Sequence, residues 1–132
     1  MEKDMKKDFR TELAKVRGRG SAHEGTEHFW LQRLTGFINL PLSIFFIVLI
    51  LSLVGEDYSV VRARLAHPVA AILMGLFTVS VLYHMKLGMQ VVIEDYIPRE
   101  GFRIFFLVLN ILFCFILGGI TIFALLKIAL GS

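Results

Sequence analysis

The sequence predicts an all-α membrane protein with three transmembrane helices. Of its 132 residues, 56% are hydrophobic and the mean hydropathy is +0.71, which is more apolar surface than a soluble domain of this length can bury. The apolar residues also gather into three long runs, at residues 34–54, 66–93 and 102–130. Each run reaches the roughly 20 residues that a helix needs to cross a bilayer core of about 30 Å. We therefore expect spans at about residues 33–54, 66–94 and 102–130.

The placement of basic residues predicts the orientation of these spans. Eight of the fourteen Lys and Arg residues precede or open the first run, and two more lie between the second and third runs. Because Lys and Arg gather on the cytoplasmic side, we expect a cytoplasmic N-terminus and a periplasmic C-terminus. Residues 1–28 would form a polar cytoplasmic segment and residues 29–132 a three-helix membrane anchor domain. Acidic residues interleave with the basic ones and no aromatic platform accompanies them, which argues against a nucleic-acid partner.

Proline and glycine mark the expected limits of the first span and the loop that follows it. Gly25, with the glycines just before it, predicts irregular backbone up to the first span. Pro41 removes one backbone hydrogen bond inside that span and predicts a kink. After the span, residues 59–64 are expected to form a brief helix at the membrane interface.

The second and third spans carry similar signals. Pro68 suits the first turn of a helix, where its missing N–H costs nothing, and Pro98 predicts the end of the same helix. In the third span, the pair Gly118-Gly119 would let another helix approach closely.

The second span contains the most informative residues of the chain. At about 100° per residue, His84, Gly88 and Asp95 share one helix face, which Phe77 extends toward the start of the span. His84 precedes Asp95 by 11 residues, which places the imidazole roughly 16 Å deeper in the membrane than the carboxylate. An ionisable residue inside a membrane span indicates a functional site.

The residues alone leave the role of His84 open. An intramembrane imidazole can hydrogen-bond a neighbouring helix, line a proton path or ligate haem iron. Gly88, one turn away, leaves the room that a porphyrin plane needs, and it equally suits close helix packing. A second haem ligand at similar depth would have to come from another chain, since the other histidines lie at or beyond a membrane boundary. These are His23, His28 and His67.

The remaining polar residues of the spans also allow two interpretations. Asp95 and Tyr96 can serve as a polar boundary of the helix, or a phenol and a carboxylate can bind and protonate a quinone. Lys86 lies about 200° around the helix from His84 and faces away from it. The single cysteine, Cys114, is expected to be a small buried apolar residue.

These residues carry a family resemblance. The run His84-x3-Gly88-x6-Asp95-Tyr96 resembles the signature of the smaller hydrophobic membrane anchor of bacterial succinate dehydrogenase (respiratory complex II). Residues 20–35 are similar to the approach to the first span in anchors of the alphaproteobacterial type. The resemblance extends over about residues 20–130.

The resemblance implies a role for each of these residues. His84 would be one axial ligand of haem b, with the second ligand supplied by the larger of the two anchor subunits, and Gly88 would make room for the haem. Tyr96 would hydrogen-bond ubiquinone, with Asp95 at the same site. Arg33 matches an arginine near the haem propionates and the quinone end.

The implied assembly is a complex of four subunits in the bacterial inner membrane. A flavoprotein subunit oxidises succinate, an iron–sulfur subunit passes the electrons on, and this chain has no catalytic activity alone. Three alternatives stay open: the anchor of a quinol:fumarate reductase, a cofactor-free structural or assembly protein, and a small ion or proton transporter. The last is disfavoured because His84 and Lys86 stand in the spans without paired carboxylates.

Overall fold

The computed structural model describes residues 23–131, and that part of the chain is entirely helical. Its elements are α2 (His23–Leu53), α3 (Tyr58–Ala66), α4 (Pro68–Tyr96) and α5 (Glu100–Ala129). Three of them, α2, α4 and α5, are long and apolar enough to cross a membrane. The prediction of an all-α protein with three spans is confirmed.

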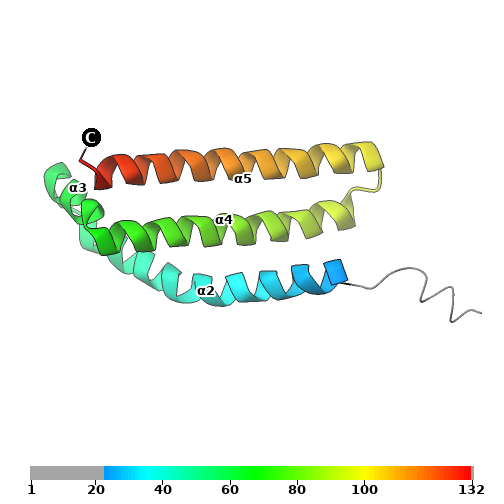
Figure 1. Ribbon diagram of the computed structural model, residues 1–132, viewed down its shortest axis with the longest axis horizontal. Coiled ribbons are helices and arrows are strands. Elements are labelled where there is room, and N and C mark those ends of the chain that lie inside the picture. The colour runs from blue at the N-terminus through cyan, green and yellow to red at the C-terminus, as the bar shows by residue number, and fades with distance from the viewer. Residues whose placement is uncertain (1–22, 132) are drawn as a thin grey trace, which may run out of the picture.

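The three long helices lie side by side in one layer, with α4 in the middle (Figure 1). The start of α2 and the end of α4 lie at one end of this layer, whereas α3 and the C-terminus lie at the other (Figure 1). The described part of the chain therefore starts and finishes at opposite ends of the helix layer. Which end faces the cytoplasm stays a prediction.

The spans agree with the hydropathy pattern except at the start of the first. Both later helices begin and end within two residues of the expected limits. Helix α2, however, begins at His23 and contains Gly25, so the prediction of irregular backbone was wrong for residues 23–32. A single glycine destabilises a helix by only about 1 kcal/mol, and the helix-favouring residues of the neighbouring turns offset that cost. The expected domain boundary between residues 28 and 29 falls inside this continuous helix, and residues 1–22 lie outside the described part.

The prolines occupy the positions that their chemistry permits. Pro68 stands in the first turn of α4, after His67 as N-cap, and Pro98 follows the end of that helix. Pro41 lies inside α2, which continues through it and bends in its middle section (Figure 1). The brief helix expected at residues 59–64 is present as α3, Tyr58–Ala66.

Helix α5 packs on α4 through one close apolar contact and one polar contact. A Cβ added to Gly118 would lie 3.0 Å from Leu82 Cδ1, so the glycine allows this close approach, as predicted. Asn110 is 9% exposed, and its amide Nδ2 donates a 3.0 Å hydrogen bond to the Lys86 carbonyl oxygen. That oxygen has two lone pairs, so it can accept this bond as well as its own helical one.

The opposite face of α4 packs on α2. The ring of Phe77 stacks on Phe46 of α2 with the centroids 5.0 Å apart. His84 and Gly88, further along the same stripe of α4, also contact α2. The part of the predicted helix face that carries Phe77, His84 and Gly88 is therefore the interface between α4 and α2, whereas Asp95 is exposed.

Most apolar side chains remain on the outside of this layer. Within residues 25–131, only Leu87 and Ile93 are buried hydrophobic residues, and the outer surfaces of α2 and α5 are largely exposed and apolar. Surfaces of this kind are compatible with acyl chains or with helices of a partner subunit, and not with water.

Adjacent glycines of α5 provide a test of this packing. Replacing Gly118 with Val should destabilise the α4–α5 contact by about 1–3 kcal/mol, because the new side chain meets Leu82. Gly119→Val is the matched control, since nothing lies within 4 Å of a Cβ at Gly119. The measurement is thermal unfolding of the chain in detergent micelles. Equal stability of the two variants would show that the contact is unimportant.

Candidate functional site

The imidazole of His84 is held against α2 by a hydrogen bond at membrane depth. Its Nδ1 lies 2.9 Å from the hydroxyl oxygen Oγ1 of Thr35, 49 positions earlier in the sequence. Thr35 is only 8% exposed and is one of two buried polar side chains in the described part of the chain. The bond therefore joins the two helices in a region where no water competes for either group.

Thr35 also makes contacts within its own helix. Its Oγ1 lies 2.7 Å from the carbonyl oxygen of Leu31 and 3.1 Å from that of Gln32. Hydroxyl donation to a carbonyl three or four residues earlier is a common arrangement for threonine inside a membrane helix. One hydroxyl group thus links the backbone of α2 to the histidine ring of α4.

The second ring nitrogen of His84 is available for other chemistry. Nε2 makes no hydrogen bond to any residue of the described part of the chain. Within the same part, no group of three or more histidine, cysteine, aspartate or glutamate side chains is arranged to bind a metal ion. At this depth of α4, His84 offers one imidazole nitrogen, and a single protein nitrogen suits a haem iron that takes its equatorial ligands from the porphyrin.

Two glycines shape the space around the histidine. A Cβ added to Gly36 of α2 would lie 3.5 Å from Cε1 of His84, so this glycine allows α2 to approach the ring closely. A Cβ added to Gly88 would lie 3.3 Å from Nε2 of the Gln32 side chain. Gly88 thus faces α2, as its position on the His84 stripe predicts. Its nearest side-chain neighbour is a glutamine whose own oxygen Oε1 is buried without a hydrogen-bond partner in the described part of the chain.

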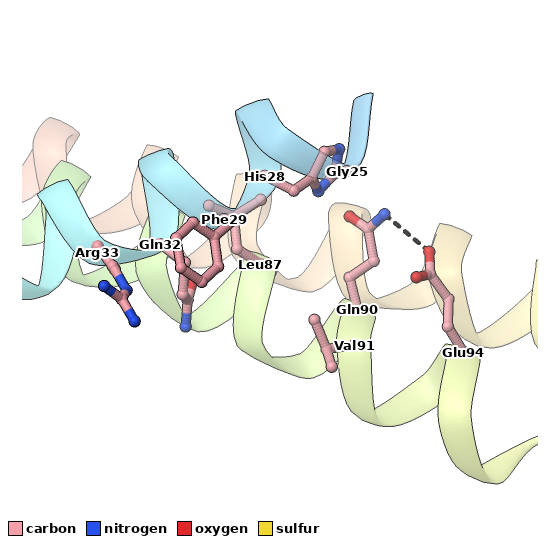
Figure 2. A pocket seen from close by; sticks show the side chains of 9 residues that line it. All are labelled: Gly25, His28, Phe29, Gln32, Arg33, Leu87, Gln90, Val91 and Glu94. Atoms are coloured by element: carbon pink, nitrogen blue, oxygen red, sulfur yellow. Dashed lines mark hydrogen bonds between the residues drawn. The ribbon is translucent and has the colours of Figure 1, made fainter. Parts of the chain in front are cut away.

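A pocket of about 570 Å³ opens between α2 and α4 near the end of the layer where α2 begins (Figure 2). Polar groups from both helices line it together with apolar ones. The lining residues are Gly25, His28, Phe29, Gln32, Arg33, Leu87, Gln90, Val91 and Glu94.

The charged groups of this pocket lie on opposite walls. On α2, the Arg33 guanidinium stacks over the Phe29 ring, 4.2 Å from its centroid. On α4, the Gln90 amide donates a 2.9 Å hydrogen bond to the Glu94 carboxylate (Figure 2). The pocket could therefore hold a ligand with an apolar body and anionic groups that reach Arg33.

Asp95 and Tyr96 lie apart from these groups, at the end of α4. Both side chains are exposed, Tyr96 by 81%, and neither lines the pocket. No hydrogen bond or ion pair joins either of them to the described part of the chain. The structure thus places His84 and Gly88 at the interface between α4 and α2, whereas Arg33 is exposed on α2 and lines a pocket whose lining residues include neither of them. Asp95 and Tyr96 are exposed at the end of α4.

The sequence did not single out three residues that shape the site: Thr35, Gly36 and Gln32. The available signal was a hydroxyl and a glycine side by side in the first apolar run, which alone resembles ordinary packing. Their importance appears only once antiparallel packing places them beside His84 and Gly88.

Comparison with known proteins gives consistent matches along most of the chain. Residues 7–119 match a family model described as the succinate dehydrogenase/fumarate reductase transmembrane subunit. A succinate dehydrogenase hydrophobic membrane anchor subunit of Rickettsia bellii is 38% identical over 96 residues, covering 73% of this chain and 77% of the relative. Its counterpart in Rickettsia conorii is 36% identical over 83% of this chain and 87% of its own length. The anchor subunit of Paracoccus denitrificans is 26% identical over 87% and 88%, respectively.

Proposed function

The chain belongs to the family of succinate dehydrogenase hydrophobic membrane anchor subunits, and from this membership we propose that it supplies one haem b ligand and part of a ubiquinone site. As an anchor subunit it is part of the succinate dehydrogenase complex in the membrane and is not catalytic alone. The specific proposal is that His84 ligates the haem iron, while Tyr96 and Asp95 bind ubiquinone where the membrane helices meet the soluble subunits.

The observation that carries the haem proposal is the asymmetric environment of the His84 ring. Nδ1 is engaged by Thr35 and Nε2 is left without a hydrogen bond in the described part of the chain. Histidine ligands of metals characteristically have one nitrogen on the metal and the other hydrogen-bonded to the protein. The chain offers one such ligand, so the second would come from the larger partner anchor.

Other residues of the site are suited to the rest of the haem. At Gly88 no side chain stands one turn from the ligand. Arg33 carries a permanent positive charge and lines the pocket that includes Leu87, the residue before Gly88. A bound haem b would accept and release one electron inside the membrane. The protein's contribution is to hold the ring, exclude water and compensate the charge of the propionates.

The quinone proposal depends on the position of Tyr96 and Asp95. The phenol can donate a hydrogen bond to a quinone carbonyl, and the adjacent carboxylate can orient that donor or relay protons from the aqueous phase. Both groups are exposed at the end of α4, where an iron–sulfur protein that receives electrons from the flavoprotein could cover them. The quinone pocket would then form between subunits.

The first test replaces His84 with Ala in the intact complex. We expect the haem b absorbance to fall to a small fraction of the wild-type value, because an axial ligand is lost. His67→Ala, at the start of the same helix, is the control and should retain the haem. Normal haem content in His84→Ala would reject ligation by this histidine, whereas the absence of haem b absorbance from the wild-type complex would favour a cofactor-free anchor.

Gly88 allows a test that separates haem space from helix packing. Gly88→Leu should lower haem content severalfold, because the side chain occupies the space proposed for the porphyrin. The leucine side chain would also clash with the Gln32 side chain. The double variant Gly88→Leu, Gln32→Ala removes this clash and should still lack haem. If the double variant regains haem, Gly88 serves helix packing instead.

Replacing Tyr96 with Phe tests the quinone site. We expect ubiquinone reduction to fall about tenfold, the effect of losing one hydrogen bond to the substrate, while succinate oxidation by an artificial dye is retained. Tyr58→Phe, an exposed tyrosine on α3, is the control. Equal losses in both assays would point to damaged assembly and not to a quinone contact.

A further inference from the structure

We infer that the Thr35 hydroxyl fixes the tautomer of His84, so that Nδ1 carries the ring proton and Nε2 keeps the lone pair that a metal requires. Thr35 would be a positioning residue for the haem, acting through the histidine. This role rests on the proposed ligation of haem by His84 and goes beyond it, because it names the group on another helix that selects the ligating nitrogen.

The Thr35 hydroxyl has a single hydrogen to share among its neighbours. Three possible hydrogen-bond partners surround Oγ1: the Leu31 carbonyl at 2.7 Å, the Gln32 carbonyl at 3.1 Å and His84 Nδ1 at 2.9 Å. Carbonyl oxygens only accept, and 2.7 Å is the ordinary length of an O–H···O bond. The hydroxyl hydrogen therefore points to Leu31, since two oxygens at that distance without a hydrogen between them would repel each other.

The direction of this hydrogen determines what His84 must do. With its hydrogen directed at Leu31, Oγ1 can only accept from the ring, so the contact at 2.9 Å is a hydrogen bond only if Nδ1 carries a proton. Iron ligation requires the neutral ring, which has one protonated and one unprotonated nitrogen. The unprotonated nitrogen is then Nε2, the one without a hydrogen bond in the described part of the chain.

The same bond should tune the iron. A ring whose N–H donates to an acceptor is a stronger electron donor through its other nitrogen, which stabilises the oxidised metal. Thr35 is 8% exposed, so water cannot readily replace its oxygen if the hydroxyl is removed. Losing the hydroxyl should therefore weaken haem binding and raise the reduction potential of the haem.

Paired substitutions at Thr35 separate the hydroxyl from the shape of the side chain. In the purified complex, Thr35→Val keeps the shape and removes the acceptor, so haem affinity should fall about tenfold and the haem potential should shift upward. Thr35→Ser keeps the acceptor and should retain the wild-type potential. Thr78→Val is the matched control, because Thr78 also bonds a carbonyl of its own helix, Met74, at 2.8 Å but has no histidine partner.

Each outcome of this experiment is decisive. A wild-type potential and haem content in Thr35→Val would overturn the inference, as would a Thr35→Ser variant that shifts as far as Thr35→Val. Haem retained in His84→Ala would instead reject the proposed ligation itself, so the two failures are distinguishable. If Thr35→Val does not assemble, infrared redox-difference spectra of the wild-type complex labelled with 15N-histidine decide the matter. Those spectra should contain ring modes of an Nδ1-protonated ligand, and their absence would overturn the inference.

Discussion

The interior of a bilayer supplies no hydrogen-bond partner, so each polar contact between the three long helices constrains how they are arranged. The two buried polar side chains of the described part, Thr35 and Asn110, lie one at each interface of α4. Each makes a hydrogen bond to α4, from α2 and from α5 respectively. A slide of either neighbour by one helical turn, about 5.4 Å, would leave a polar group unpaired in hydrocarbon. Two hydrogen bonds thus specify an axial register that apolar packing alone would leave loosely defined.

This arrangement divides the proposed functional residues into two groups along α4. His84 is positioned by contacts within the chain, through Thr35 and Gly36. Tyr96 lies 12 residues further along, roughly 18 Å in a helix, and is exposed. On the proposed function, the haem ligand is held in place by this chain before any partner binds, whereas the quinone site is completed by partner subunits.

Hydropathy predicted the spans well, because the length of an apolar run and the thickness of a bilayer are directly related. The prediction of irregular backbone that rested on the glycines was wrong at the start of α2, because one glycine costs a helix only about 1 kcal/mol. Hydropathy could not correct it, since an apolar run does not show where helical hydrogen bonding begins. Helical periodicity likewise predicted that His84 and Gly88 share a face. It could not identify Thr35 as the partner of that face, because the register between α2 and α4 depends on a proline bend and on α3, which lie between them in the chain. The groups that would complete the proposed quinone site around Asp95 and Tyr96 belong to other subunits, so this sequence could not predict them.

The internal bonds of Thr35 have a consequence for biosynthesis. Helix α2 emerges from the ribosome before α4 exists, so for a time it must enter the bilayer without its neighbour. Because the Thr35 hydroxyl donates to the carbonyl of Leu31 in its own helix, this hydroxyl is not an orphaned donor when the solitary segment enters the lipid. Only an acceptor lone pair is left over, which hydrocarbon tolerates more readily than an unpaired N–H or O–H. His84 bonds to that lone pair once α4 has inserted. The Thr35 hydroxyl therefore allows α2 to insert alone and also fixes where α4 packs against it.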